Sequence, residues 1–337
     1  MFEKSKATDT LARARSNRFR GWFSPRQSPD TAAARFHTKS YFPVHFTPGF
    51  KIQQDSNVFA LGSCFARGVE IFFMNRKIPV LTSDFFVPLS CYNLVQPEQE
   101  KTMPNGHWGI LNKYNPHSVL MELQRALTDY PVPDEGLIEL TPGEWFDPQA
   151  TNGKPGSFEA VLSLRKQILE VTGRIRRADV VFITLGMTET WYDSKTQLSL
   201  NTPPSPIYLK ALGNRFYFKN ASYQEVLDCL RSILTLLKTH GKPELKIALT
   251  VSPVPFGATF TGMDVVQANS YSKATLLSAT RQVVTEFEGI DYFPSYEMVV
   301  NTPMELAFKE DCAHVQTGMV DFVMNRFCEG YLAAPVA

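Results

Sequence analysis

Short apolar segments that end near Gly or Pro alternate with longer segments of helical periodicity, and this alternation constrains the fold more than any other feature. The clearest apolar segment is "ADVVFITLG", Ala178–Gly186. Its apolar residues run continuously, which is typical of a parallel strand buried on both faces. The other segments expected to form strands are Asn57–Gly62, Ile78–Phe86, Leu245–Pro255 and Gly289–Tyr296.

The segments between these strands repeat apolar residues every three or four positions, as amphipathic helices do. Phe65, Val69 and Phe72, for example, fall on one helical face directly after the first strand. The other expected helices are Asn115–Leu127, Ser157–Arg177, Tyr223–Thr239, Gln267–Phe287 and Gln316–Cys328. Strands separated by helices predict an α/β fold, with a five-stranded parallel sheet and helices on both faces. Ligands of such sheets bind at the C-terminal ends of the strands.

The alternation of strands and helices begins only after about residue 45, which divides the chain into two parts. We expect residues 46–337 to form one catalytic domain. Residues 1–45 have little apolar periodicity and predict a flexible arm. This arm is basic, with nine Lys or Arg against three Asp or Glu in residues 1–40, although the whole chain has a net charge of +1. An arm that docks on an anionic partner is the alternative.

Residues 191–219 interrupt the pattern with short β-like pieces and prolines, "QLSLNT", "PIYLK" and "NRFYFKN". We expect this segment to be a small β insertion at the C-terminal edge of the sheet, where it would cover the site as a lid. Residues 96–116 and 129–156 are expected to be long loops.

Composition excludes several classes of protein. No apolar run approaches the roughly 18–20 residues of a membrane span, and the N-terminus lacks the apolar segment of a secretory signal. The five cysteines include no CxxC pair, which argues against a zinc ribbon or a disulfide framework. We therefore expect a cytoplasmic protein with reduced thiols, no bound metal and no nucleic-acid partner.

The stretch "FALGSCFARGVEIFF" places Ser63 and Cys64 where the first strand passes into a helix. Serine is a favoured helix N-cap. At the same position its hydroxyl would be exposed at the sheet edge as a nucleophile, close to backbone N–H groups and the helix dipole. Gly62 permits the tight turn, so the two roles are compatible. Cys64 is expected to point towards the core, as free cysteines commonly do.

A serine nucleophile needs a base, and the base needs an orienting partner. His314 is the only histidine with an aspartate three residues before it, in "EDCAHVQTG". This segment follows the last strand and precedes the last helix, where it can bring His314 over the end of the first strand. Asp311 would then accept from Nδ1–H and leave Nε2 facing Ser63. The alternative is a solvated loop in which Asp311 only forms a turn.

The segment after the third strand, "LGMTETW", offers candidates for an oxyanion hole. Gly186 can bring a backbone N–H close to substrate, and Thr188 offers a hydroxyl. Glu189 is expected to be a buried carboxylate that ties loops together. Gly109 and Asn115 could supply further donors or simply shape their turn.

These motifs resemble the GSCFA family, a bacterial group named for the residues found here as "GSCFA", positions 62–66. The resemblance continues in order through residues 45–330, in the stretches "YNP", "GMTETW", "SPVP", "YFPSYE" and Asp-x-x-His. It implies an SGNH/GDSL-like hydrolase fold, which is a flavodoxin-like three-layer α/β sandwich.

The resemblance also implies roles for individual residues. Ser63 corresponds to the nucleophile of the superfamily, although the aspartate of the usual Gly-Asp-Ser turn is absent. Asp311 and His314 match the terminal Asp-x-x-His. Thr188 stands where the superfamily has the asparagine of its oxyanion hole, beside the Ser63 and Gly186 N–H groups. Trp191, at the end of the same block, is a candidate supporting residue.

From these implications we expect a serine esterase or O-acyltransferase that acts on an acyl ester of a carbohydrate or other small molecule through a covalent acyl-enzyme. No cofactor is needed for hydrolysis. A transferase would use acyl-CoA, whose phosphates the basic arm could meet. The alternatives are a glycan O-acetyltransferase that uses acetyl-CoA in polysaccharide biosynthesis, and a non-catalytic glycan- or partner-binding protein that keeps the fold.

Overall fold

A four-stranded parallel sheet lies at the centre of the computed structural model, which describes residues 5–23, 28–92 and 109–333. The strand order is β1–β4–β8–β9, and each neighbouring pair is parallel. The strands are β1 (Val58–Gly62), β4 (Val180–Leu185), β8 (Lys246–Val251) and β9 (Ile290–Tyr292). The predicted α/β class with a parallel sheet is confirmed.

The predicted strand Ile78–Phe86 is much shorter than expected. Only Val80 pairs with β1, through a parallel bridge to Val58. The Val58 N–H donates to Pro79 O at 2.8 Å, and the Leu81 N–H donates to Val58 O at 2.9 Å. The chain then turns away, because Thr82 is buried and donates to Glu70 at 2.7 Å. Val80 nevertheless occupies the place of a fifth strand, in the flavodoxin-like order.

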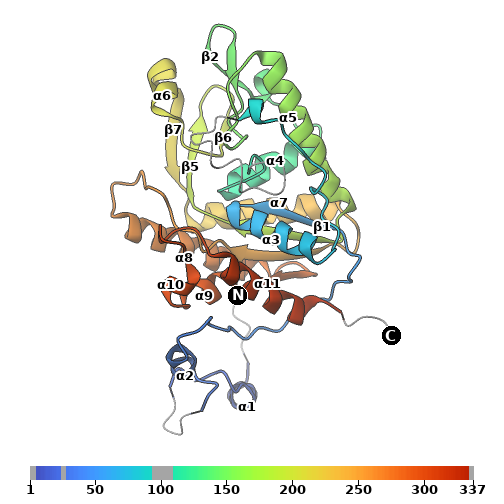
Figure 1. The fold of residues 1–337 in the computed structure, drawn as a ribbon, viewed down its shortest axis with the longest axis vertical. Helices are drawn as coiled ribbons and strands as arrows, with labels where there is room; N and C mark the ends of the chain where they lie inside the picture. The colour runs from blue at the N-terminus through green and yellow to red at the C-terminus, as the bar shows by residue number, and fades with distance from the viewer. Residues whose placement is uncertain (1–4, 24–27, 93–108, 334–337) are drawn as a thin grey trace.

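Helices cover both faces of the sheet (Figure 1). Alternate strand residues face opposite sides: Phe59 and Leu61 belong to one apolar core, whereas Val58 and Ala60 belong to the other. The first core is covered by α4 (Pro116–Leu127), α7 (Tyr223–His240) and α8 (Val265–Val283). The second is covered by α3 (Cys64–Asn75), α9 (Ser295–Val300), α10 (Met304–Ala307) and α11 (Thr317–Tyr331).

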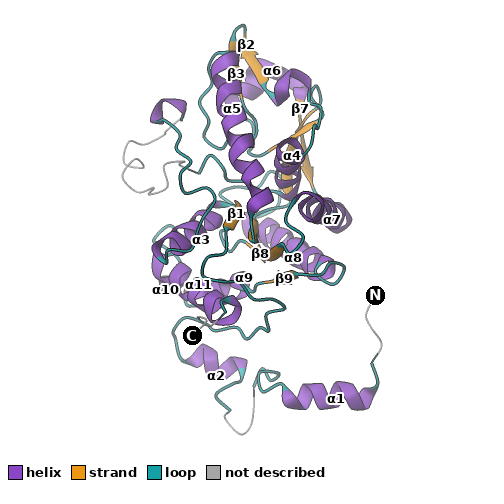
Figure 2. Ribbon diagram, turned by 90° about the vertical axis from the view of Figure 1, so that its right-hand side faces the viewer, coloured by secondary structure: helices purple, strands orange, loops and turns teal. Residues whose placement is uncertain are grey.

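Long α5 (Phe158–Gly173) packs beside α4 and continues into a 3-10 turn at Arg174–Arg177 (Figure 2). Further 3-10 turns lie at Leu89–Cys91, Pro133–Gly136 and Gly213–Arg215. Most of the predicted loop 96–116 lies outside the described residues. Within 129–156, predicted to be a loop, the chain forms the hairpin β2 (Ile138–Thr141) and β3 (Glu144–Phe146). These strands are too short to show a clear apolar alternation.

The predicted β insertion contains a three-stranded antiparallel sheet in the order β6–β5–β7. Its elements are β5 (Glu189–Asp193), β6 (Leu198–Leu200), α6 (Pro206–Leu212) and β7 (Phe216–Asn220). The piece "PIYLK", expected to be β-like, is helical instead, because Ser205 caps it and Pro206 occupies its first turn. Asp193 is fully buried and pairs with Arg215 at 2.5 Å. Asn201, just after β6, hydrogen-bonds to Asn112 O at 2.7 Å. The segment is therefore tied into the domain by buried polar contacts.

The N-terminal segment is only partly separate from the domain. Helix α1 (Ala7–Ser16) has no buried residue, and it lies with α2 (Ala32–His37) below the α9–α11 side of the domain in Figure 1. By contrast, the Phe42 N–H donates to Thr302 Oγ1 at 2.9 Å, and the Phe46 ring packs 5.3 Å from Phe293. The last part of the predicted arm thus lies against the domain. Within the described residues, no helix is long and apolar enough to span a membrane.

A buried cluster of charges fixes the loop that leads into α4. Glu122 on α4 pairs with Lys113 at 3.1 Å and with Arg165 on α5 at 2.7 Å. Arg165 also pairs with Asp147 at 3.3 Å, and none of these side chains is more than 2% exposed. Burial alone would raise the pKa of Glu122, but Arg165 and Lys113 lower it to about 2. The Glu122 carboxylate is therefore charged, and it pairs with two buried cations, Lys113 and Arg165.

Replacing Glu122 with Ala should lower the free energy of unfolding by about 3–5 kcal/mol, because it leaves two buried cations without their shared partner. Urea unfolding at neutral pH measures the change. The control is Glu329→Ala, which removes a partly exposed partner of Arg326 and should cost no more than about 1 kcal/mol. Equal losses in the two variants would contradict this account of the cluster.

Candidate active site

The turn after β1 can be made only by glycine. Gly62 has a φ of +130°, and a Cβ at this position would lie 2.2 Å from Thr184 O on β4. Ser63 follows as the N-cap residue of α3, and its N–H donates to Thr184 Oγ1 at 3.0 Å. The turn thus places Ser63 at the C-terminal edge of the sheet.

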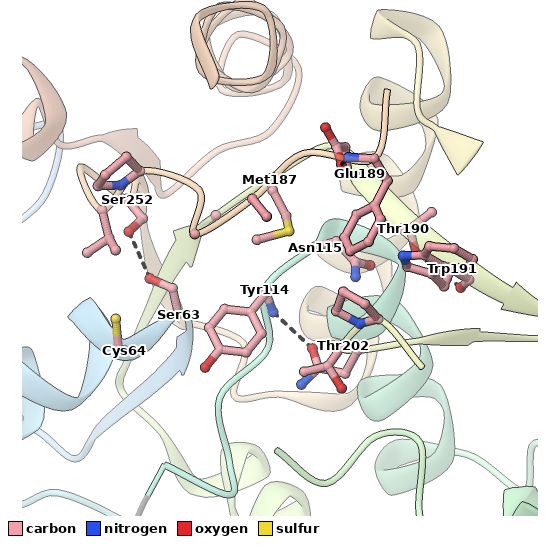
Figure 3. Close-up of a pocket in the computed structure, with 18 of the residues that line it drawn as sticks. Ser63, Cys64, Tyr114, Asn115, Met187, Glu189, Thr190, Trp191, Thr202 and Ser252 are labelled. Carbon is pink, nitrogen blue, oxygen red and sulfur yellow. Dashed lines mark hydrogen bonds between the residues drawn. The ribbon is translucent and has the colours of Figure 1, made fainter. Parts of the chain in front are cut away.

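The hydroxyl of Ser63 does not cap the helix. No capping hydrogen bond is made by its side chain, although the residue occupies the N-cap position. Instead Oγ donates to Ser252 Oγ at 2.9 Å and lies 3.3 Å from Thr184 Oγ1. Figure 3 shows the hydroxyl directed towards Ser252, which follows β8. The predicted capping role of the side chain is therefore wrong, and the hydroxyl remains free of the helix.

Asp311 and His314 form a pair in the loop before α11. His314 Nδ1 lies 2.6 Å from Asp311 Oδ2. Asp311 Oδ1 accepts the N–H groups of Ala313 and His314, each at 2.9 Å. These bonds, led by the one from the imidazole, hold the pKa of Asp311 well below its usual range. Asp311 therefore orients the ring as well as shaping the turn.

Ser63 and His314 line the same pocket, which has a volume of about 430 Å³. Within the described residues, no hydrogen bond joins them, and the Ser63 hydroxyl donates to Ser252. Both side chains of the Asp311–His314 pair are largely exposed. None of the described residues that line this pocket is a Lys or Arg. Most of its wall is apolar, including Met187, Trp191, Leu200, Val254, Pro255 and Phe260.

Two segments meet at the floor of the pocket. A Cβ on Gly186 would lie 2.5 Å from Tyr114 O, and the Met187 N–H donates to the same oxygen at 2.9 Å. The Tyr114 N–H in turn donates to Asn201 Oδ1 at 2.9 Å, the second dashed bond in Figure 3. The close approach requires glycine at position 186, and it brings Tyr114 beside the end of β4.

The two candidates in the loop before α4 differ in position. Asn115 lines the pocket, but its Oδ1 caps α4 by accepting the Ser118 N–H at 2.8 Å, and its Nδ2 donates to Leu200 O at 3.3 Å. Gly109 does not line the pocket; it has a φ of +74° and accepts the Asn112 N–H at 2.8 Å. Gly109 is thus a turn residue, and Asn115 a helix cap at the pocket wall.

Thr188 does not face the pocket. It is fully buried, its hydroxyl donates to Asn220 Oδ1 at 2.7 Å, and its N–H donates to Ser272 Oγ at 2.8 Å. The structure therefore corrects the expected placement of this hydroxyl in an oxyanion hole. The Ser63 N–H, another expected donor, is already bonded to Thr184.

Glu189 and Trp191 join β5 to the loop that follows β8. Glu189 is buried, and its carboxylate accepts the Thr259 hydroxyl at 2.5 Å and the Phe260 N–H at 3.0 Å. The Trp191 ring packs edge-on against Phe260, with centroids 5.2 Å apart. Both residues thus hold the apolar wall of the pocket in place.

Three residues near Ser63 were not singled out from the sequence as site residues. Thr184 and Ser252 contact Ser63 directly. Thr184 lies on β4 and Ser252 directly follows β8, so no local spacing to Ser63 reveals them. Lys273 on α8 is fully buried and donates to Gly186 O at 2.6 Å and to Val254 O at 2.8 Å. Within the described chain no carboxylate pairs with it, and burial lowers its pKa to about 7. The sequence does not predict this burial, because the residues around Lys273 in α8 are mostly polar.

Cys64 also differs from expectation. It is only half-buried and lines the pocket, so it does not point into the core as predicted. Burial raises the pKa of its thiol, which keeps it protonated and makes it a poor nucleophile at neutral pH.

The fold and the edge residues define an α/β protein in which a serine and a histidine line one pocket, and an aspartate bonds the histidine. The model of the GSCFA family matches residues 57–327, and the chain belongs to this family. No curated protein matches the chain.

Two solved structures match most of the chain at low similarity. One, described as a GDSL-like lipase from Parabacteroides merdae, is 11% identical, with 84% of this chain and 98% of that chain covered and a TM-score of 0.36. The other, a family 3 carbohydrate esterase from Clostridium thermocellum, is 10% identical, with 82% and 94% covered and a TM-score of 0.34. At this level of similarity their activities are not transferred to this chain.

Replacing Lys273 with Met should change how stability depends on pH. The pKa of Lys273 is about 7 in the folded protein and 10.5 as the ordinary value. Between these pH values the unfolded chain binds more protons, so this group makes stability rise with pH. We therefore compare the free energies of unfolding of the wild type and Lys273→Met. The wild-type value minus the variant value should increase by about 3–4 kcal/mol between pH 7 and pH 10.

Urea unfolding of both proteins across this range checks the prediction. Other titrating groups are common to the two proteins and cancel in the difference. A difference that stays constant with pH would show that Lys273 keeps an ordinary pKa and that its burial has been misjudged.

Proposed function

We propose that this protein is a serine esterase in which Ser63 is the nucleophile, His314 the general base and Asp311 the group that orients the imidazole. One observation carries the proposal: Ser63 lines the same pocket as His314, whose Nδ1 is held 2.6 Å from Asp311. This is the set of groups that acyl transfer to serine needs.

The reaction begins with a rotation of the Ser63 side chain from Ser252 towards His314. Because Nδ1–H donates to Asp311, Nε2 of the neutral ring is an acceptor. It takes the hydroxyl proton as Oγ bonds to the acyl carbon, and then gives that proton to the departing alcohol oxygen. Water, activated by the same nitrogen, attacks the acyl-enzyme and releases the acid and free Ser63. Every proton moves between Ser63, His314, water and substrate, so hydrolysis uses no cofactor.

The negative oxygen of the tetrahedral intermediate needs donors other than Thr188. Ser252 lines the pocket, and its oxygen accepts from Ser63. Its own proton has no acceptor among the described residues, so it is available once Ser63 turns away. We assign Ser252 and the backbone N–H of Gly186 as the donors to this oxygen.

The pocket favours an uncharged, apolar acyl group. Its wall is largely apolar, and among the described residues that line it there is no Lys or Arg for the phosphates of acyl-CoA. This favours hydrolysis over transfer from acyl-CoA. The amides of Asn115 and Asn201 are bonded to the protein itself, which leaves few free groups for a sugar. Carbohydrate esters, implied by the family resemblance, are therefore substrates to compare with simple esters.

The engaged Asp311–His314 pair also bears on the alternative of a non-catalytic binding protein. Binding alone does not require an imidazole oriented by a carboxylate at 2.6 Å, whereas general-base catalysis does. The catalytic reading is therefore favoured over this alternative.

A fluorophosphonate probe should label the wild type at Ser63, as located by mass spectrometry of peptides. Ser63→Ala should abolish labelling, because no hydroxyl remains to attack phosphorus. His314→Ala should slow labelling about 10²–10⁴-fold, because the proton of Ser63 has no acceptor. Ser232→Ala, on α7 and exposed, is the matched control and should label at the wild-type rate. Labelling that survives Ser63→Ala, at Cys64 for example, would disprove the assignment.

A further inference from the structure

A second hollow, of about 260 Å³, borders His314 on the side of α3 and α11. It shares Cys64, Val254 and His314 with the pocket, but Ser63 does not line it. We call it the α3–α11 groove. His314 therefore lies where two cavities meet, and only one of them contains the nucleophile.

The groove has an apolar floor and a polar rim. The floor is formed by Phe65, Ile71, Phe72, Val315 and Val320. Gly68 also lines the groove, and a Cβ there would lie only 3.2 Å from Val320 Cγ1. Its polar lining residues are exposed at the edge: Asn75, Lys309, Thr317 and Asp321. A ligand in this groove would bury apolar atoms and leave polar ones in water.

The chemistry of ester cleavage determines which part of a substrate lies there. In the first step a bond forms between Ser63 Oγ and the acyl carbon, and the bond from that carbon to the alcohol oxygen breaks. The alcohol oxygen takes its proton from His314 Nε2, so it must lie beside that ring. The acyl group, bonded to Ser63, occupies the pocket. The alcohol part extends past His314 into the α3–α11 groove, which His314 lines and Ser63 does not.

We propose that the α3–α11 groove binds the alcohol part of the ester, and that this part is an alkyl or aryl alcohol rather than a sugar. The proposal rests on the esterase function proposed above and adds its leaving-group class. The floor offers the contacts that an apolar chain needs, and it offers no hydrogen-bonding group to a ring of hydroxyls.

The test uses butyrate esters of methanol, butanol and hexanol, together with glucose 6-butyrate. For the wild type, kcat/KM should rise about threefold to fourfold for each methylene that enters the groove. The measured quantity is the ratio of kcat/KM for hexyl butyrate to that for methyl butyrate. Glucose 6-butyrate should be a poorer substrate than hexyl butyrate.

Two variants alter the groove by different means. Val320→Phe fills it, and Ile71→Gln places an amide on its floor at a half-buried position outside the main apolar core. Both should bring the hexyl-to-methyl ratio close to one. The control Val300→Gln makes the same kind of change at a residue of α9 that is 43% exposed; it should keep the wild-type ratio and activity. Thermal unfolding confirms that each variant is folded.

Several results would overturn the proposal. An unchanged ratio in folded Ile71→Gln would show that the alcohol lies elsewhere. Faster hydrolysis of glucose 6-butyrate than of hexyl butyrate would show that the alcohol is a sugar. If the wild type shows no hydrolysis that Ser63→Ala abolishes, the esterase function itself fails, and this proposal fails with it.

Discussion

The contact between Gly62 and Thr184 determines where every other group of the site can lie. A Cβ at Gly62 would overlap Thr184 O at 2.2 Å, so a side chain would force β1 away from β4 at the edge where Ser63 begins its helix. With glycine, the strands stay in register to their ends, and Ser63 reaches Thr184 and Ser252 across the edge. The position of the hydroxyl is therefore set by the sheet and not by the loops around it.

Buried charges hold the loops against this edge. Lys113 is anchored by Glu122 and by Gln149 O, and it fixes the segment that reaches the end of β4. Lys273 bonds the carbonyls of Gly186 and Val254, one in the turn after β4 and the other after β8. Burying a charge costs several kcal/mol unless partners replace water. The cluster around Glu122 has such partners. Lys273 has only carbonyl oxygens as partners among the described residues. Groups whose pKa is strongly perturbed in this way are concentrated at functional sites.

The fold was predictable because its signal is local. Continuous apolar runs identified all four main strands, and helical periodicity identified the long covering helices α3, α4, α7, α8 and α11. The short helices α9 and α10 were not expected, because one or two turns are too short to show the period. The Asp311–His314 pair was predictable for the same reason, since its members are only three positions apart in the sequence. Ser252 and Lys273 were not, because their contacts depend on which strands become neighbours. The prediction for Thr188 was wrong because its hydroxyl donates to Asn220, at the end of β7 in the insertion. The position of Thr188 just after β4 gives no information about this distant partner.

The exposure of His314 is consistent with the proposed chemistry. Its side chain is 62% exposed in the free protein, and in water the attraction between an imidazolium and a carboxylate is weak. An ester that fills both the pocket and the α3–α11 groove would cover the ring from two sides. The dielectric around His314 would then fall, and Asp311 would stabilise the imidazolium more strongly once the proton has moved. Substrate binding would thus complete a site whose carboxylate is already in place, and apolar groups on both sides of the ester would contribute to catalysis by excluding water.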